Sequence, residues 1–221
     1  MTEYSIEIVR GHILVTDDRG RKVLLDTGSP FSFHVDGAVT LGGETFSVRT
    51  SLMGVDSTYV TDNVGTRVDG LVGMDILGRT GLLLDVPGGR VVFGYPTDGM
   101  TRVPSRYGLG YMSVEMDIRG RRAKVILDTG APTSYVSPAL TEGLAAVDTV
   151  EDFNPTVPGG RFTTPIFEFP AAFAEQSFEM RAGHLPALLR TTLALLGVDG
   201  VVGMELLKRQ PLLLADGGVW I

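Results

Sequence analysis

Leu24-Leu25-Asp26-Thr27-Gly28-Ser29-Pro30 decides the fold, and it recurs as Ile126-Leu127-Asp128-Thr129-Gly130-Ala131-Pro132. In each copy, two apolar residues lead into an acid, a hydroxyl residue, a glycine, a small residue and a proline. The two aspartates are 102 residues apart in a chain of 221. A repeat this long predicts two copies of one domain rather than a short-period solenoid. We therefore expect each half of the chain to supply one carboxylate to a shared site.

A second pair of motifs follows in the same order. Val68 to Leu77 reads VDGLVGMDIL, and Val198 to Leu207 reads VDGVVGMELL. The offset between these copies is 130 residues, so the second half holds 28 extra residues between its two motifs. The halves are therefore expected to share a framework but to differ in one insertion.

Alternating polarity and glycine-rich turns predict an all-β chain with short helices. The expected strands cover residues 5–9, 12–16, 22–25, 31–35, 44–52, 57–61, 81–86, 90–94, 111–118, 124–127, 147–153, 161–169 and 218–221. Ser137-Pro138 resembles a helix start, with Ser137 as the N-cap. Residues 186–196 predict a second helix, with Leu185, Leu188, Leu189 and Leu196 on one face and Gly197 ending it.

The composition argues against several classes of protein. There is no cysteine, which excludes disulfides and thiolate metal sites, and three scattered histidines argue against a zinc site. A net charge of −7 argues against nonspecific nucleic-acid binding. The first residues lack the blocks of a signal peptide, and no apolar run approaches the roughly 20 residues that span a bilayer. These features predict a cytoplasmic protein with no membrane or nucleic-acid partner.

The paired motifs resemble those of the aspartic proteases, in which Asp-Thr-Gly follows an apolar strand and two aliphatic residues with a glycine lie later in each lobe. Two such lobes in one chain resemble pepsin, whereas their small size resembles retropepsin subunits. The resemblance implies two lobes related by a pseudo-twofold axis, at residues 1–96 and 111–221, joined by a linker at 97–110. A chain with both lobes needs no partner to pair its acids, so a monomer is expected.

The resemblance also implies the chemistry. Asp26 and Asp128 would share one proton and activate a water that attacks a peptide bond, without metal or cofactor. Thr27 and Thr129 would hydrogen-bond across the lobe boundary, and Gly28 and Gly130 would keep backbone N–H groups near the carboxylates. The two loops differ where Ser29 in the first corresponds to Ala131 in the second. Because a hydroxyl favours an ionised neighbour, we expect Asp26 to carry more of the negative charge.

Aspartic proteases cover their cleft with a hairpin, called the flap, which pepsin-like enzymes carry on the first lobe. Here the surplus residues lie in the second half, so the expected flap is the hairpin at 147–169, with Pro155, Pro158, Gly159 and Gly160 near its tip. Alternatively, this hairpin is a surface excursion without a role in the cleft. Phe33 and Tyr135 each lie seven residues after an aspartate, where either substrate contact or core packing explains an aromatic residue.

Two functions therefore stay open. The first is an endopeptidase acting on a peptide or protein substrate, and both complete Asp-Thr-Gly triplets favour it. The second is a peptide-binding or scaffold module that uses the same cleft without catalysis. The unequal halves argue against an artificial fusion of two identical subunits.

Overall fold

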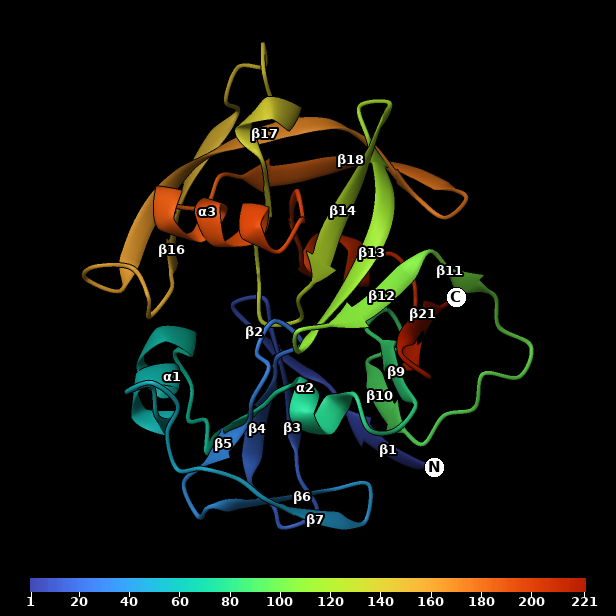
Figure 1. Ribbon diagram of the computed structural model, residues 1–221. Helices are drawn as coiled ribbons and strands as arrows, with labels where there is room; N and C mark the ends of the chain where they lie inside the picture. Colours follow the sequence, from blue (N-terminus) through green and yellow to red (C-terminus); the bar gives the residue numbers. More distant parts are fainter.

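The computed structural model describes residues 1–221 (Figure 1). Strands hold 46% of the residues and helices 13%, so the chain is mostly β, as predicted. None of the helices has the length and apolar character needed to cross a bilayer.

A five-stranded sheet belongs wholly to the first half of the chain. Its order is β2 (Glu7–Val9), β3 (His12–Thr16), β4 (Lys22–Leu25), β8 (Gly70–Val72) and β5 (Phe33–His34). Strand β4 lies parallel to β8 with Leu24 opposite Leu71. This pairing brings the Leu71-Val72-Gly73 motif beside the strand that leads into Asp26.

The second half builds the corresponding arrangement within a larger, eight-stranded sheet. Its order is β12 (Ser105–Gly108), β13 (Tyr111–Ile118), β14 (Arg121–Leu127), β19 (Gly200–Val202), β15 (Ser134–Val136), β18 (Gln176–Gly183), β17 (Arg161–Phe173) and β16 (Asp148–Phe153). Strand β14 lies parallel to β19 with Ile126 opposite Val201. The second aspartate therefore follows its strand in the same setting as the first.

A six-stranded sheet combines strands from both halves. Its order is β1 (Thr2–Ser5), β10 (Arg90–Phe93), β9 (Leu82–Asp85), β20 (Leu212–Ala215), β21 (Gly218–Trp220) and β11 (Arg102–Val103). The halves meet where β9 pairs antiparallel with β20, centred on Leu83 opposite Leu213. One hydrophobic cluster of 39 buried residues runs through both halves, which ties them into one core.

The segment predicted as a linker, residues 97–110, contains two of these strands. Strand β11 pairs with β21, and β12 pairs with β13. Val103 is buried by these contacts. The sequence shows no periodicity here because both strands are short and gain their stability from partners elsewhere in the chain.

The remaining elements are short. They are the β6–β7 pair (Ala38–Leu41, Glu44–Ser47), the helices α1 (Ser57–Val64), α2 (Met74–Leu77), α3 (Ala187–Leu195) and α4 (Met204–Leu207), and the 3₁₀-helix η1 (Pro138–Leu140). Ser137 precedes η1 at the expected N-cap position, but its side chain makes no capping hydrogen bond.

The predicted strand at 57–61 is wrong, because these residues begin α1. Asp56 caps the helix by accepting the Tyr59 N–H (2.9 Å), and Gly65 ends it with a left-handed backbone at φ 81°. The β-branched residues in this stretch favour a strand by propensity, but the two caps and the burial of Val60 and Val64 outweigh that preference.

The predicted helix at 186–196 corresponds to α3, but its leucine face differs from the expected one. Leu188 is 64% exposed, whereas Leu193 and Leu196 pack on a small cluster that includes Val198 and Val201. No residue of α3 is fully buried, so this helix is held loosely against the second half.

The Asp56 cap can be tested by mutation. Asp56→Ala should lower the free energy of unfolding by about 1 kcal/mol, because a side-chain cap of α1 is lost. Urea denaturation measures this change. Asp62→Ala is the matched control, since Asp62 is an exposed acid within the same helix. Equal stability of the two variants would contradict the capping role.

Candidate active site

Each aspartate lies in a loop that begins where a buried strand ends. The backbone N–H of Asp26 donates to the Val72 carbonyl (2.9 Å), and that of Asp128 donates to the Val202 carbonyl (2.9 Å). The strands β8 and β19 thus fix the start of both loops. Gly73 then passes so close to the first loop that an added Cβ would lie 2.7 Å from the Ser29 carbonyl oxygen. This contact explains why the aliphatic pair must be followed by glycine.

Thr27 and Thr129 hold the two loops together through four buried hydrogen bonds. The Thr27 N–H donates to Thr129 Oγ1 (2.9 Å), and the Thr129 N–H donates to Thr27 Oγ1 (2.9 Å). Each hydroxyl then donates to the strand of the other half, Thr27 to the Leu127 carbonyl (2.8 Å) and Thr129 to the Leu25 carbonyl (2.7 Å). Both threonines have 0% exposure, so water cannot replace these bonds.

The two carboxyl groups face each other across this junction. A Cβ added to Gly28 would overlap the carboxyl group of Asp128, and one added to Gly130 would lie 2.6 Å from Asp26 Cγ. Gly28 donates its N–H to Asp26 Oδ1 (2.9 Å), and Gly130 donates to Asp128 Oδ1 (2.8 Å). The carboxyl groups also hydrogen-bond each other. The glycines are required because any side chain would occupy the space of the opposite acid.

Burial and mutual repulsion control the protonation of this pair. Desolvation, followed by the charge and hydrogen bond of Asp128, raises the pKa of Asp26 well above its usual range. Desolvation also raises the pKa of Asp128, while N–H donors and Asp26 oppose that rise. Both residues nevertheless keep part of their surface open to solvent. The pair therefore holds a proton where a substrate or water could reach it.

The structure does not support the reason given for the predicted charge assignment within the pair. The Ser29 hydroxyl donates to the Phe31 carbonyl (2.8 Å) and not to Asp26. The pKa of Asp26 is raised well above its usual range, which gives no support to an excess of negative charge on Asp26. Ala131 is buried and packs with Ile126, Val198 and Val201.

Phe33 and Tyr135, at corresponding positions, have different roles. Phe33 is 2% exposed and packs in a core cluster with Val60 and Val64 of α1, so its predicted contact with substrate is not supported. Tyr135 is also buried, but its hydroxyl donates to Asp152 on β16. Burial and the charge of Asp152 raise the pKa of Tyr135. This contact joins the second aspartate region to the predicted flap.

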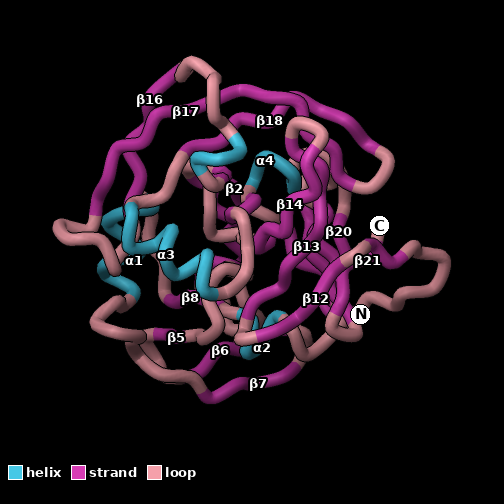
Figure 2. Tube along the Cα trace, turned by 45° about the horizontal axis from the view of Figure 1, so that its top comes forward, coloured by secondary structure: helices cyan, strands magenta, loops and turns pink.

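The β16–β17 hairpin forms as predicted and reaches across to the first half (Figure 2). Pro158 and Gly159 are exposed at its tip, and Gly160 faces the Tyr59 hydroxyl of α1. Arg161 donates to Asn63 Oδ1 of α1 (3.3 Å), and the Phe153 ring packs 6.3 Å from the Tyr59 ring. The hairpin thus contacts both halves through residues near its tip, Asp152 in contact with Tyr135 of the second half and Phe153 and Arg161 with α1 of the first.

His12 and Tyr111 lie next to two turns of the site that the sequence reasoning missed. Each follows a turn with positive φ at two residues, Arg10-Gly11 and Leu109-Gly110. A Cβ at Gly11 would lie 2.8 Å from Pro132, and one at Gly110 would lie 2.6 Å from Pro30, so each turn contacts the aspartate loop of the other half. The sequence did contain a signal for these turns, because a glycine precedes the strand in both halves, Gly11 before His12 and Gly110 before Tyr111.

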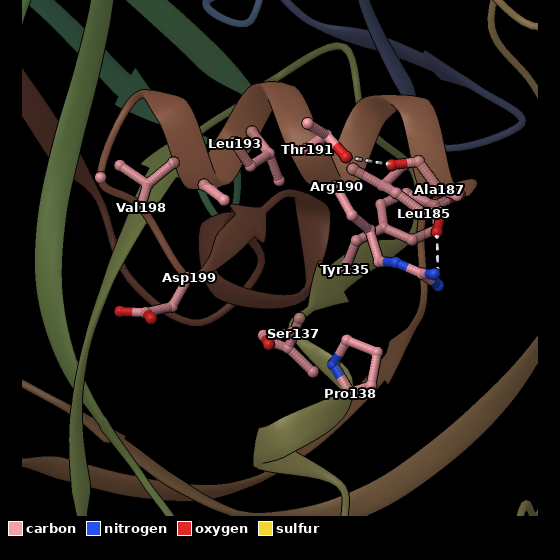
Figure 3. Close-up of a pocket in the computed structure, with 13 residues that line it drawn as sticks. Tyr135, Ser137, Pro138, Leu185, Ala187, Arg190, Thr191, Leu193, Val198 and Asp199 are labelled. Carbon is pink, nitrogen blue, oxygen red and sulfur yellow. Dashed lines mark hydrogen bonds between the residues drawn. The ribbon is translucent and has the colours of Figure 1, made fainter.

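A cavity of about 620 Å³ lies beneath α3, next to Tyr135 (Figure 3). Leu185, Leu193 and Val198 line its apolar part, and Arg190 and Asp199 lie toward opposite ends. The corresponding region of the first half is filled, because α1 buries Val60 and Val64 against Phe33. Neither aspartate lines this cavity, which makes it a separate feature beside the carboxyl pair.

No three or more His, Asp or Glu side chains gather as a metal-binding group. No family model and no curated protein sequence matches the chain.

The threonine hydrogen bonds predict a measurable loss of stability. Thr129→Val should lower the free energy of unfolding by about 2–4 kcal/mol, because two buried backbone groups lose their partner. Thr129→Ser keeps the hydroxyl and should cost only about 1 kcal/mol for the lost methyl group. Urea denaturation compares the two, and equal losses would show that packing rather than hydrogen bonding matters here.

The raised pKa values predict how stability depends on pH. An acid with a raised native pKa binds more protons when folded, so it weakens the native state as pH rises past the unfolded value near ~4. Asp26→Asn should therefore increase the unfolding free energy at about pH 7, and this gain should vanish near about pH 3. Asp98→Asn, at an exposed position, is the control. A stability loss at neutral pH would contradict the assignment.

Proposed function

We propose that this chain is an aspartic endopeptidase of retropepsin-like type, with two lobes related by a pseudo-twofold axis. The support is a set of reciprocal contacts. Thr27 and Thr129 exchange equivalent hydrogen bonds, and each of Gly28 and Gly130 faces the other half's aspartate. Leu83 pairs with its counterpart Leu213 in the shared sheet. Reciprocity of this kind is the property of a twofold interface.

The observation that carries the proposal is the carboxyl pair. Two acids that hydrogen-bond each other in a desolvated site share one proton, which is the behaviour of the catalytic dyad in aspartic proteases. Asp128, the ionised member, takes a proton from a bound water, and the resulting hydroxide attacks the peptide carbonyl carbon. Asp26, the protonated member, donates a hydrogen bond to the carbonyl oxygen.

The second step returns the enzyme to its starting state. The tetrahedral intermediate collapses when its C–N bond breaks, and the leaving nitrogen takes the proton that Asp128 had accepted. Asp26 keeps its proton throughout and hydrogen-bonds the carbonyl oxygen as the carbonyl forms again. The rigid threonine junction keeps both carboxyl groups in place throughout, so no reorganisation of the loops is needed during the reaction.

The β16–β17 hairpin is proposed as the cover of this site. It comes from the second half, whereas pepsin-like enzymes carry their flap on the first lobe. Its contacts with α1 connect it to the first half as well. A substrate backbone would lie beneath it, next to the carboxyl pair. Because Phe33 and Tyr135 are both buried, the hairpin is the better supported contact for the substrate.

A peptide-binding module without catalysis is the second candidate. The 620 Å³ cavity favours it, because this space excludes both aspartates. A protein that used the cavity alone would bind a peptide without cleaving it.

Cleavage of a denatured protein mixture between about pH 3 and pH 7 separates these functions. The purified chain should cut the mixture, and pepstatin should block the cleavage. Asp26→Asn and Asp128→Asn should each lower the rate by about 100-fold or more, because the acid or the base is lost. Asp98→Asn should keep the wild-type rate. Peptide binding without any cleavage in the wild-type chain would favour the binding module.

A further inference from the structure

Asp69 and Asp199 hold the same position in the internal repeat. Asp69 Oδ2 accepts the backbone N–H of Lys22 (3.1 Å), and Asp199 Oδ2 accepts the backbone N–H of Lys124 (2.9 Å). The two lysines lie on β4 and β14, the strands that lead into the aspartate loops. The backbone therefore places the two carboxyl groups alike.

The halves differ in what the other carboxyl oxygen contacts. In the first half, Arg67 donates Nε (3.0 Å) and Nη2 (2.8 Å) to Asp69 Oδ1, and Asp69 is only 6% exposed. The residue two positions before Asp199 is Gly197, which has no side chain to make this contact. Asp199 is exposed, and no Lys or Arg side chain lies within 4.0 Å of its carboxylate. The second half therefore lacks the guanidinium partner that the first half supplies.

The open carboxylate of Asp199 lies at the edge of the cavity under α3. Leu185, Leu193 and Val198 form the apolar wall of this cavity, and Arg190 lies at its other end (Figure 3). Arg190 donates to the Leu185 carbonyl (3.2 Å) and has no carboxylate within 4.0 Å. The volume of about 620 Å³ falls within the range of roughly 300–1,000 Å³ that is typical of ligand sites. The cavity thus has an apolar middle, a negative end and a positive end.

We propose that this cavity binds a short peptide in which an arginine is flanked by apolar residues. The guanidinium of that arginine takes the place at Asp199 that Arg67 takes at Asp69, where its planar fork suits a carboxylate better than an ammonium group does. The apolar neighbours of the arginine lie against the apolar wall and are removed from water there. The positive charge of Arg190 disfavours the opposite orientation, because it repels a second guanidinium.

This site is separate from the carboxyl pair, because neither Asp26 nor Asp128 lines the cavity. The inference names the ligand class for the cavity that favours the binding-module candidate, and it does not depend on catalysis. In a protease, the same site would hold a segment of the substrate away from the scissile bond.

Isothermal titration calorimetry with acetyl-Leu-Arg-Leu-amide tests the proposal, since the guanidinium is the only charge on this peptide. Excess pepstatin is included to keep the probe from the carboxyl pair. The same peptide with citrulline in place of arginine keeps the shape without the charge, and it should bind about 10-fold more weakly. Asp199→Asn keeps an oxygen for the Lys124 N–H but removes the charge, so it should weaken binding of the arginine peptide by a similar factor.

Glu175→Gln removes a different exposed acid of the second half and is the matched control, which should leave binding unchanged. In Asp199→Asn the arginine and citrulline peptides should bind equally, because the charge that distinguishes them is gone. Equal binding of both peptides to the wild-type chain, no binding of either, or an equal loss in Glu175→Gln would overturn the inference. Arginine-selective binding that Asp199→Asn removes, in a chain that cleaves no protein, would support this site while the proposed protease function failed.

Discussion

The buried hydrogen bonds between Thr27 and Thr129 are the constraint on which the rest of the site depends. They connect two loops that are 102 residues apart, and each hydroxyl reaches the strand that carries the other loop. Neither residue is exposed to water in the folded chain, so water does not compete for these four bonds. Separating the loops would break all four. The junction therefore holds two acids together in a buried setting. Burial raises the pKa of both, and the charge of Asp128 adds to the rise for Asp26.

In both halves, neighbouring strands hold the aspartate loops in place at this junction. Strands β8 and β19 accept the first N–H of each aspartate loop, and their terminal glycines allow the close crossing. The β9–β20 pairing joins the halves a second time, in the shared sheet. The halves differ mainly in what surrounds the repeat. The first packs α1 on Phe33, whereas the second leaves a cavity under α3 and adds the β16–β17 hairpin.

The sequence predicted the parts of this structure that depend on local motifs. The paired Asp-Thr-Gly and aliphatic-Gly motifs are visible because glycine is the one residue that fits at Gly28, Gly73 and their counterparts. The hairpin at 147–169 was predictable from its two strands and glycine-rich turn. The prediction of a strand at 57–61 was wrong because it gave weight to the β-branched residues and none to Asp56 and Gly65, which cap a helix.

Contacts between distant segments could not be predicted. The bond from Tyr135 to Asp152 and the packing of His12 under Phe153 depend on where the hairpin lies, and no local pattern encodes that placement. The argument for the charge assignment lost its basis for a similar reason, since the Ser29 hydroxyl donates to the Phe31 carbonyl. The most direct measurement of the central claim is a ¹³C NMR titration of the wild-type chain. A shared proton predicts that both aspartate carboxyl signals follow the same two steps, whereas independent single steps near the usual value of about 4 would contradict it.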